Sequence, residues 1–119
     1  MTVLIVDDNA QVRLLLRDYL PASADEVYEC VDGDEAFACY ERYRPDWVLM
    51  DWDMPRMNGI AAIRAIRRAF PTARICMVTA FGYEELGEAA LAAGACAVVA
   101  KSRLYELEAV LAPSSSPLT

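Results

Sequence analysis

Short apolar runs alternate along the chain with longer segments in which apolar residues recur every three or four positions. Such runs are typical of strands covered on both faces, and the longer spacing is typical of amphipathic helices. We expect strands at residues 2–6, 27–31, 47–50, 74–78 and 95–100, and helices at 10–20, 33–43, 59–70, 83–93 and 103–111. Five strands alternating with five helices predict an α/β fold, a parallel sheet wrapped on both faces.

Three of the expected helices carry an apolar stripe. In the first the stripe is Val12, Leu15, Leu16 and Tyr19, and in the second it is Ala36, Phe37, Tyr40 and Tyr43. In the third, Ile63, Ile66 and Phe70 face inward, while Arg64, Arg67 and Arg68 face water. Caps mark the helix starts: Asn9 before the first, Asp32 with Glu35 as a capping box before the second, and Ser102 before the last.

Four of the five expected strands end in polar residues: Asp7 and Asp8 after the first, Asp51 after the third, Thr79 after the fourth and Lys101 after the fifth. Ligands of open α/β sheets bind at the carboxyl ends of the strands, so we expect these side chains to converge. Taken alone, Asp7 and Asp8 could form an acidic turn that caps a helix, Thr79 could be an ordinary strand end, and Lys101 could be a solvated lysine. The pattern of all these residues together favours a ligand-binding site.

Three carboxylates within several ångströms would repel by roughly 4 kcal/mol per close pair at an effective dielectric constant of about 20. A hard cation with oxygen ligands, such as Mg²⁺, would offset that repulsion. Lys101 would face the carboxylates as a fixed positive charge. The hydroxyl of Thr79 and the backbone N–H beside it, at Ala80, would donate hydrogen bonds to the oxygens of a bound phosphoryl group.

Composition narrows the function classes. The 119 residues suffice for one domain, and the net charge of -7 argues against direct nucleic acid binding. No apolar run is long enough for a signal peptide or a bilayer helix, so we expect a cytoplasmic protein without membrane contact. The chain has no histidine, which excludes an internal imidazole base or phosphohistidine. The four widely spaced cysteines favour buried thiols in a reducing compartment over a zinc site or a disulfide framework.

Several motifs together resemble the receiver domains of bacterial two-component response regulators. They are Asp7-Asp8, Asp51 followed by Met54-Pro55-x-Met57-Asn58-Gly59, Thr79-Ala80, and Lys101. The resemblance covers residues 1–112 and implies a single doubly wound five-stranded parallel sheet, (βα)5, with the flavodoxin-like strand order 2-1-3-4-5. Residues 113–119, rich in serine and proline, would be a C-terminal tail or the start of a linker.

The resemblance also implies roles for individual residues. Asp51 would accept a phosphoryl group from a sensor histidine kinase or a histidine phosphotransfer protein. Asp8, Asp51 and the backbone carbonyl of Asp53 would bind Mg²⁺, with Asp7 acting mainly through water. Lys101 would pair with the phosphoryl group, while Thr79 would move toward it and switch a face that binds a downstream protein target. Such a domain signals and does not turn over external substrates, and a homodimer stays open.

Two positions depart from the receiver pattern. Many receivers place tyrosine or phenylalanine three residues before the lysine, where this chain has Val98, and many follow the lysine with proline, where it has Ser102. Asp53 and Phe81 would flank the path of water that attacks the phosphoryl group. Val12 and Leu15 have two equal interpretations, as part of the core or as part of a surface on which a kinase docks.

Three other functions stay open at this level. Asp51-Trp52-Asp53 is an Asp-x-Asp, as in phosphatases of the haloacid dehalogenase type, but there the motif follows the first strand, and here Pro55 interrupts its continuation. A flavodoxin-like flavin carrier shares the architecture, but two acids after the first strand would repel the cofactor phosphate. A phosphate-independent interaction module would need none of these acids.

Overall fold

A computed structural model describes residues 1–80 and 83–112, and within these ranges five strands alternate with five α-helices. The strands are β1 (Thr2–Val6), β2 (Glu26–Cys30), β3 (Trp47–Asp51), β4 (Ile75–Thr79) and β5 (Ala97–Ala100). The helices are α1 (Ala10–Asp18), α2 (Gly33–Tyr43), α3 (Gly59–Ala69), α4 (Tyr83–Ala93) and α5 (Leu107–Leu111), with a 3-10 helix η1 (Lys101–Glu106) before α5. Phe81 and the predicted tail at 113–119 lie outside the described residues, so that domain boundary stays a prediction.

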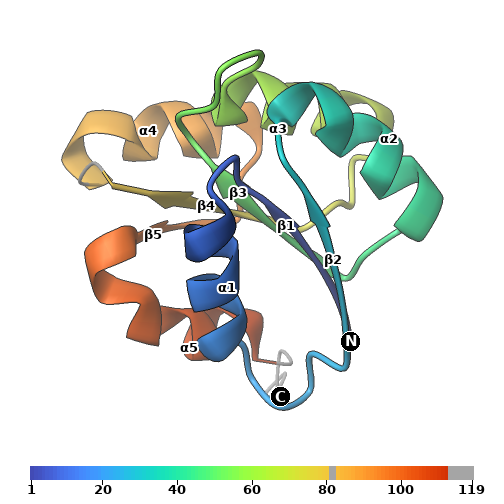
Figure 1. Cartoon of the computed structure of the whole chain (residues 1–119). Coiled ribbons are helices and arrows are strands. Elements are labelled where there is room, and N and C mark those ends of the chain that lie inside the picture. Colours follow the sequence, from blue (N-terminus) through green and yellow to red (C-terminus); the bar gives the residue numbers. More distant parts are fainter. Residues whose placement is uncertain (81–82, 113–119) are drawn as a thin grey trace, which may run out of the picture.

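The strands form one parallel sheet in the order β2-β1-β3-β4-β5, which confirms the predicted fold class and strand order. Helices α1 and α5 cover one face, and α2, α3 and α4 cover the other (Figure 1). Val6 pairs with Met50, and Asp51 pairs with Val78. This register brings the carboxyl ends of β1, β3 and β4 to the same edge of the sheet.

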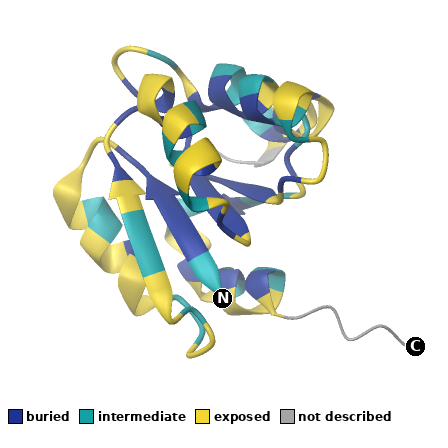
Figure 2. Cartoon of the chain, turned by 90° about the vertical axis from the view of Figure 1, so that its right-hand side faces the viewer, coloured by how far each residue is buried: buried dark blue, intermediate teal, exposed yellow. Residues whose placement is uncertain are grey.

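The core consists of two apolar layers, one on each side of the sheet. Alternate side chains of a strand point to opposite faces, so Leu4 and Val6 join the layer under α2, α3 and α4, while Val3 and Ile5 join the layer under α1 and α5. Strands β3 and β4 are buried at every position and β1 at every position after Thr2, whereas exposed residues lie on the outer sides of the helices and along the edge strand β2 (Figure 2). A rigid, doubly covered sheet therefore holds the strand ends in place.

The last helix ends at Leu111 as predicted, but the prediction for its start and its cap is wrong. Ser102 is exposed and makes no capping hydrogen bond, and Arg103 has non-helical φ and ψ of -135° and 41°. Residues 101–106 form a 3-10 helix, and the α-helix begins only at Leu107. A 3-10 helix has three residues per turn, which places the buried side chains of Leu104 and Leu107 on the same side, against the sheet.

The apolar stripe predicted for the first helix is also wrong in part. Leu16 is buried, but Leu15 and Tyr19 are 45% and 41% exposed, and Leu16 is the one residue of this nine-residue helix that is fully buried. In α3, Arg67 does not simply face water, since its guanidinium donates to the carbonyls of Pro71 and Ala73 beyond the helix end. The second-helix stripe and the inward Ile63 and Ile66 are confirmed.

The four cysteines are free thiols, as expected, but they are not all buried. Cys30 and Cys76 lie in the core, Cys39 is half-buried and Cys96 is exposed. Burial raises the pKa of the Cys76 thiol to about 12. The core thiols therefore stay protonated at neutral pH and behave as small apolar groups.

Candidate functional site

A cleft of about 300 Å³ opens at the carboxyl edge of the sheet, where β1, β3, β4 and β5 end. All seven residues singled out from the sequence line it, together with Asn9, Val12 and Trp52. The seven are Asp7, Asp8, Asp51, Asp53, Thr79, Ala80 and Lys101. The structure thus brings together residues that are separated by up to about ninety positions, because each follows a strand of one parallel sheet.

Three carboxylates gather in the cleft. One oxygen from each of Asp7, Asp8 and Asp51 lies within 4.8 Å of the others, and Asp7 and Asp51 are buried while Asp8 is exposed. Asp7 Oδ1 accepts a hydrogen bond of 2.9 Å from the backbone N–H of Asn9. Asp7 Oδ2 is buried and accepts no hydrogen bond within the described ranges. The charge that compensates this oxygen is the ammonium of Lys101, 3.2 Å away.

These oxygens fit a divalent cation. Carboxylate and carbonyl oxygens are the ligands that Mg²⁺ takes in proteins, usually together with water. Asp51 and Asp8 present carboxylates to the cleft, and the exposed Asp53 follows Asp51 at its rim. Asp7 Oδ2, which accepts no hydrogen bond within the described ranges, faces the same cluster and would contact the ion or a water bound to it.

Lys101 is the positive charge of the cleft. It stands directly after β5 at the start of η1, and its ammonium Nζ lies 2.9 Å from Asp51 Oδ1 and 3.2 Å from Asp7 Oδ2. Both contacts are ion pairs, so the Asp7 oxygen that accepts no hydrogen bond within the described ranges still faces a positive charge. The lysine predicted to face the carboxylates therefore reaches two of them at once.

The charges shift the acid–base properties of the cleft. Burial raises the pKa of Asp51 to about 6, with the charges of Asp7 and Asp8 adding to the rise and the hydrogen bond from Lys101 opposing it. Burial lowers the pKa of the Lys101 ammonium, but its hydrogen bond and attraction to Asp51, with the charge of Asp7, outweigh burial and raise it above the ordinary value. At neutral pH the site therefore holds ionised Asp51 beside protonated Lys101.

The loop after β3, from Trp52 to Asn58, turns the chain sharply beneath Asp51. The N–H of Gly59 donates to the carbonyl of Trp52, and Asn58 caps α3 by accepting from the N–H of Ala61. A Cβ at Gly59 would lie 2.1 Å from the backbone oxygen of Asp51, so only glycine fits there. In the Asn-Gly pair of the sequence motif, Asn58 caps the helix, and Gly59 is required by backbone packing directly under the site.

On the other side of the cleft, Thr79 is buried as the last residue of β4, and the adjacent Ala80 is exposed. Both line the cleft with Asp51 and Lys101. The hydroxyl residue Thr79 and the small residue Ala80 therefore border the same cleft as Asp51 and Lys101, as the sequence predicted.

Sequence reasoning missed two residues that support this cleft. Arg13 of α1 donates from Nη1 to the carbonyl of Asp7 and from Nε to Glu29 on β2, at 2.7 Å each. Asp32, read from the sequence only as a helix cap, also accepts from the backbone N–H groups of Arg56 and Met57 in the loop after β3. The sequence carries no signal for Arg13. Asp32, however, directly follows the strand predicted at residues 27–31, and the same position after a predicted strand singled out Asp7 and Asp51.

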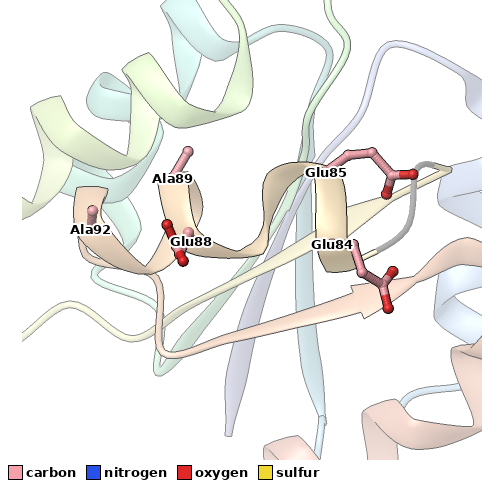
Figure 3. A pocket seen from close by; sticks show the side chains of 5 residues that line it. All are labelled: Glu84, Glu85, Glu88, Ala89 and Ala92. Atoms are coloured by element: carbon pink, nitrogen blue, oxygen red, sulfur yellow. The ribbon is translucent and has the colours of Figure 1, made fainter.

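A larger hollow of about 670 Å³ lies along α4 (Figure 3). Its lining consists of Glu84, Glu85, Glu88, Ala89 and Ala92, which all belong to that one helix. None of the residues singled out from the strand ends reaches it. The chemistry of the chain therefore belongs to the smaller cleft, where charges of both signs meet.

Comparison with known proteins gives a consistent result. A family model described as the response regulator receiver domain matches residues 3–112. The chemotaxis protein CheY of Thermotoga maritima is 43% identical over 94 residues, which cover 78% of each chain. A protein-glutamate methylesterase/protein-glutamine glutaminase of Geobacter metallireducens is 41% identical over 103 residues, which cover 85% of this chain but only 30% of that protein.

Solved structures show the same fold. CheY in the CheX-CheY-BeF3-Mg²⁺ complex from Borrelia burgdorferi aligns with a TM-score of 0.78 at 31% identity, covering 85% of this chain and 78% of that one. A two-component response regulator of the LuxR family from Aurantimonas aligns with a TM-score of 0.79 at 34% identity, covering 89% and 78%. Within residues 1–80 and 83–112, no helix has the length and apolar character needed to cross a membrane.

Proposed function

The chain belongs to the family of response regulator receiver domains of two-component signalling, and from that premise we propose that Asp51 is its phosphoacceptor. The observation that carries the proposal is the pairing of a buried, ionised Asp51 with Lys101 at 2.9 Å, inside a cleft that two further carboxylates share. An anionic nucleophile beside a fixed cation suits the transfer of a phosphoryl group.

In the proposed reaction, a carboxylate oxygen of Asp51 attacks the phosphorus of a phosphohistidine on a partner. A P–O bond forms, the P–N bond breaks, and the imidazole nitrogen leaves and takes up a proton. The phosphohistidine must lie outside residues 1–119, on a sensor histidine kinase or a histidine phosphotransfer protein, because these residues include no histidine. Water later cleaves the acyl phosphate and releases inorganic phosphate.

The residues around Asp51 take separate parts in this reaction. Lys101 stays beside Asp51 and pairs with an oxygen of the phosphoryl group, while the Thr79 hydroxyl and the N–H of Ala80 donate to the others. Asp8, Asp51 and the carbonyl of Asp53 would hold Mg²⁺, and Asp7 would act through water. When bound, Mg²⁺ supplies positive charge that offsets the repulsion between the carboxylates and the phosphoryl oxygens. The structural relative from Borrelia, whose complex contains BeF3 and Mg²⁺, supports this assignment.

The covalent intermediate is the proposed signal. A phosphoryl group adds about -1.5 to -2 charges at neutral pH, and Thr79 and Lys101, at the ends of β4 and β5, respond to that charge. Their movement changes the face formed by α4, β5 and α5, which binds a downstream protein in the cytoplasm. Val98 replaces the aromatic residue found in many receivers, so the change passes through Thr79 and Lys101 without an aromatic rotation.

Intact-protein mass spectrometry tests this proposal. Wild type and Asp51→Asn are incubated with Mg²⁺ and a small acyl phosphate, with EDTA in a parallel sample. We expect wild type alone to gain one phosphoryl group, only with Mg²⁺, and to lose it in mild hydroxylamine. No gain from this donor or from a phosphorylated kinase would instead favour a phosphate-independent interaction module.

A further inference from the structure

Asp32 is a buried carboxylate that the proposed reaction does not use. It stands between β2 and α2, outside the cleft, and its side chain is as deeply buried as that of Asp7. A carboxylate is retained in such a position only where hydrogen bonds compensate for its burial. The donors that surround Asp32 therefore indicate what it does.

Most of these donors belong to the loop after β3 and not to the helix that Asp32 caps. Oδ2 accepts from the backbone N–H of Arg56 at 3.0 Å, and Oδ1 accepts from that of Met57 at 2.9 Å. The capping bond to the N–H of Asp34 is longer, at 3.3 Å. Asp32 thus ties together two segments that lie 24 and 25 residues apart in the sequence.

The start of α2 presses directly on the same loop. A Cβ at Gly33 would lie 2.5 Å from the backbone oxygen of Met57, so the two backbones are in close contact. Helices α2 and α3 lie side by side on one face of the sheet, and the loop enters α3 at the end next to α2 (Figure 1). Asp32 and Gly33 together form one wall against which the loop rests.

The loop is held at three points, and Asp53 lies between two of them. Directly before Asp53, the carbonyl of Trp52 accepts from the N–H of Gly59, and directly after it, Met54 is buried in the core. Downstream, the third point is the pair of bonds to Asp32. The side chain of Asp53 is exposed, whereas its neighbours Trp52 and Met54 are both held, so these anchored flanks set where its carbonyl points.

We propose that Asp32 is a positioning residue for the metal site, because its two bonds to the loop after β3 orient the backbone carbonyl of Asp53 toward the cleft. This inference rests on the proposed function, in which that carbonyl is a ligand of Mg²⁺. Residues that orient metal ligands without touching the metal typically change its affinity by about 10- to 100-fold when they are replaced.

Three variants separate this role from helix capping and from surface charge. Asp32→Ser keeps one oxygen that can cap α2 but has no second oxygen for the loop. Asp32→Asn keeps the size of the side chain but places an amide donor against one of the backbone donors. The control is Arg56→Ala, which removes the exposed ion pairs of that side chain with Asp34 and Glu35 and leaves the backbone N–H in place.

The test is a Mg²⁺ titration of all four proteins, followed through tryptophan fluorescence, to which Trp52 in the cleft and Trp47 in the core both contribute. Urea unfolding of the metal-free proteins is measured in parallel. We expect Asp32→Ser and Asp32→Asn to weaken Mg²⁺ binding at least about tenfold, and Arg56→Ala to bind as wild type does. The rate of phosphorylation should fall at limiting Mg²⁺ and recover at saturating Mg²⁺.

The outcomes are distinct. If the Asp32 variants are less stable but bind Mg²⁺ as tightly as wild type, Asp32 only supports the fold and the positioning role is overturned. Equal weakening by Arg56→Ala would assign the effect to surface charge and overturn it as well. If wild type itself shows no response to Mg²⁺, the proposed function fails first, and this inference fails with it.

Discussion

Replacing Asp51 with asparagine is expected to make the protein more stable in the absence of Mg²⁺. Burial, reinforced by Asp7 and Asp8, raises the pKa of Asp51 from 3.8 to about 6. About 2 pKa units correspond to roughly 3 kcal/mol of strain in the ionised form. Because the cleft admits water that screens the charges, we expect a gain of about 1–2 kcal/mol. Lys101 keeps its ion pair with Asp7 in the variant.

The sign of the pH dependence follows from the raised pKa. Between about pH 4 and pH 6, the folded protein holds a proton on Asp51 that the unfolded chain has already released. The free energy of unfolding of wild type therefore falls across this window as the pH rises, relative to Asp51→Asn. The difference between the two proteins should be small near pH 4 and largest above pH 7.

Urea unfolding followed by circular dichroism measures this difference, at pH 4.5, 6 and 7.5 in EDTA and again with excess Mg²⁺. Mg²⁺ should stabilise wild type by mass action and should stabilise the variant much less, since one of its carboxylates is gone. An Asp51→Asn protein that is less stable than wild type in EDTA at pH 7.5 would refute the reasoning. A stability difference that does not change with pH would refute it equally.

Three further predictions concern the supports of the site. Lys101→Ala leaves two buried carboxylates without their cation, so the urea midpoint without Mg²⁺ should fall, and phosphorylation followed by mass spectrometry should slow about a hundredfold. Gly59→Ala places a Cβ against the backbone oxygen of Asp51 and should lower the free energy of unfolding by about 3 kcal/mol, measured in urea. The third concerns Asp32: burial raises its pKa, but backbone hydrogen bonds from Arg56, Asp34 and Met57 outweigh burial and hold it below the ordinary value. The stability that Asp32→Ser loses should therefore be fully present above about pH 5 and vanish as the pH falls below about 4, in urea unfolding across pH.

The fold and the neighbours in the site could be predicted from local patterns. Asp51 follows a run of four residues that is apolar at every position, and a run of that kind and length is typical of a strand covered on both faces. Once the strands are parallel, their carboxyl ends share an edge, so Asp51, Thr79 and Lys101 had to lie near one another. The roles of these residues stay predictions, since geometry alone does not establish a reaction.

Other features depend on contacts between distant segments, which a local pattern does not carry. Asp32 matches a capping pattern, but its hydrogen bond with the N–H of Met57, which is 25 residues away in the sequence, forms only when α2 packs beside the loop. Leu15 fits a helical stripe, but α1 turns Leu16 toward the sheet and leaves Leu15 exposed. Ser102 resembles a cap, yet packing of Leu104 against the sheet favours the tighter helix.

The most direct measurement is to locate the phosphoryl group on the chain. Wild type is phosphorylated with Mg²⁺ and a small acyl phosphate, the acyl phosphate is reduced with borohydride, and the peptides are sequenced by mass spectrometry. Reduction converts a phosphorylated aspartate to homoserine, so we predict homoserine at position 51 and at no other aspartate. Homoserine at Asp7, Asp8 or Asp53, with Asp51 unmodified, would contradict the assignment of Asp51 as the phosphoacceptor.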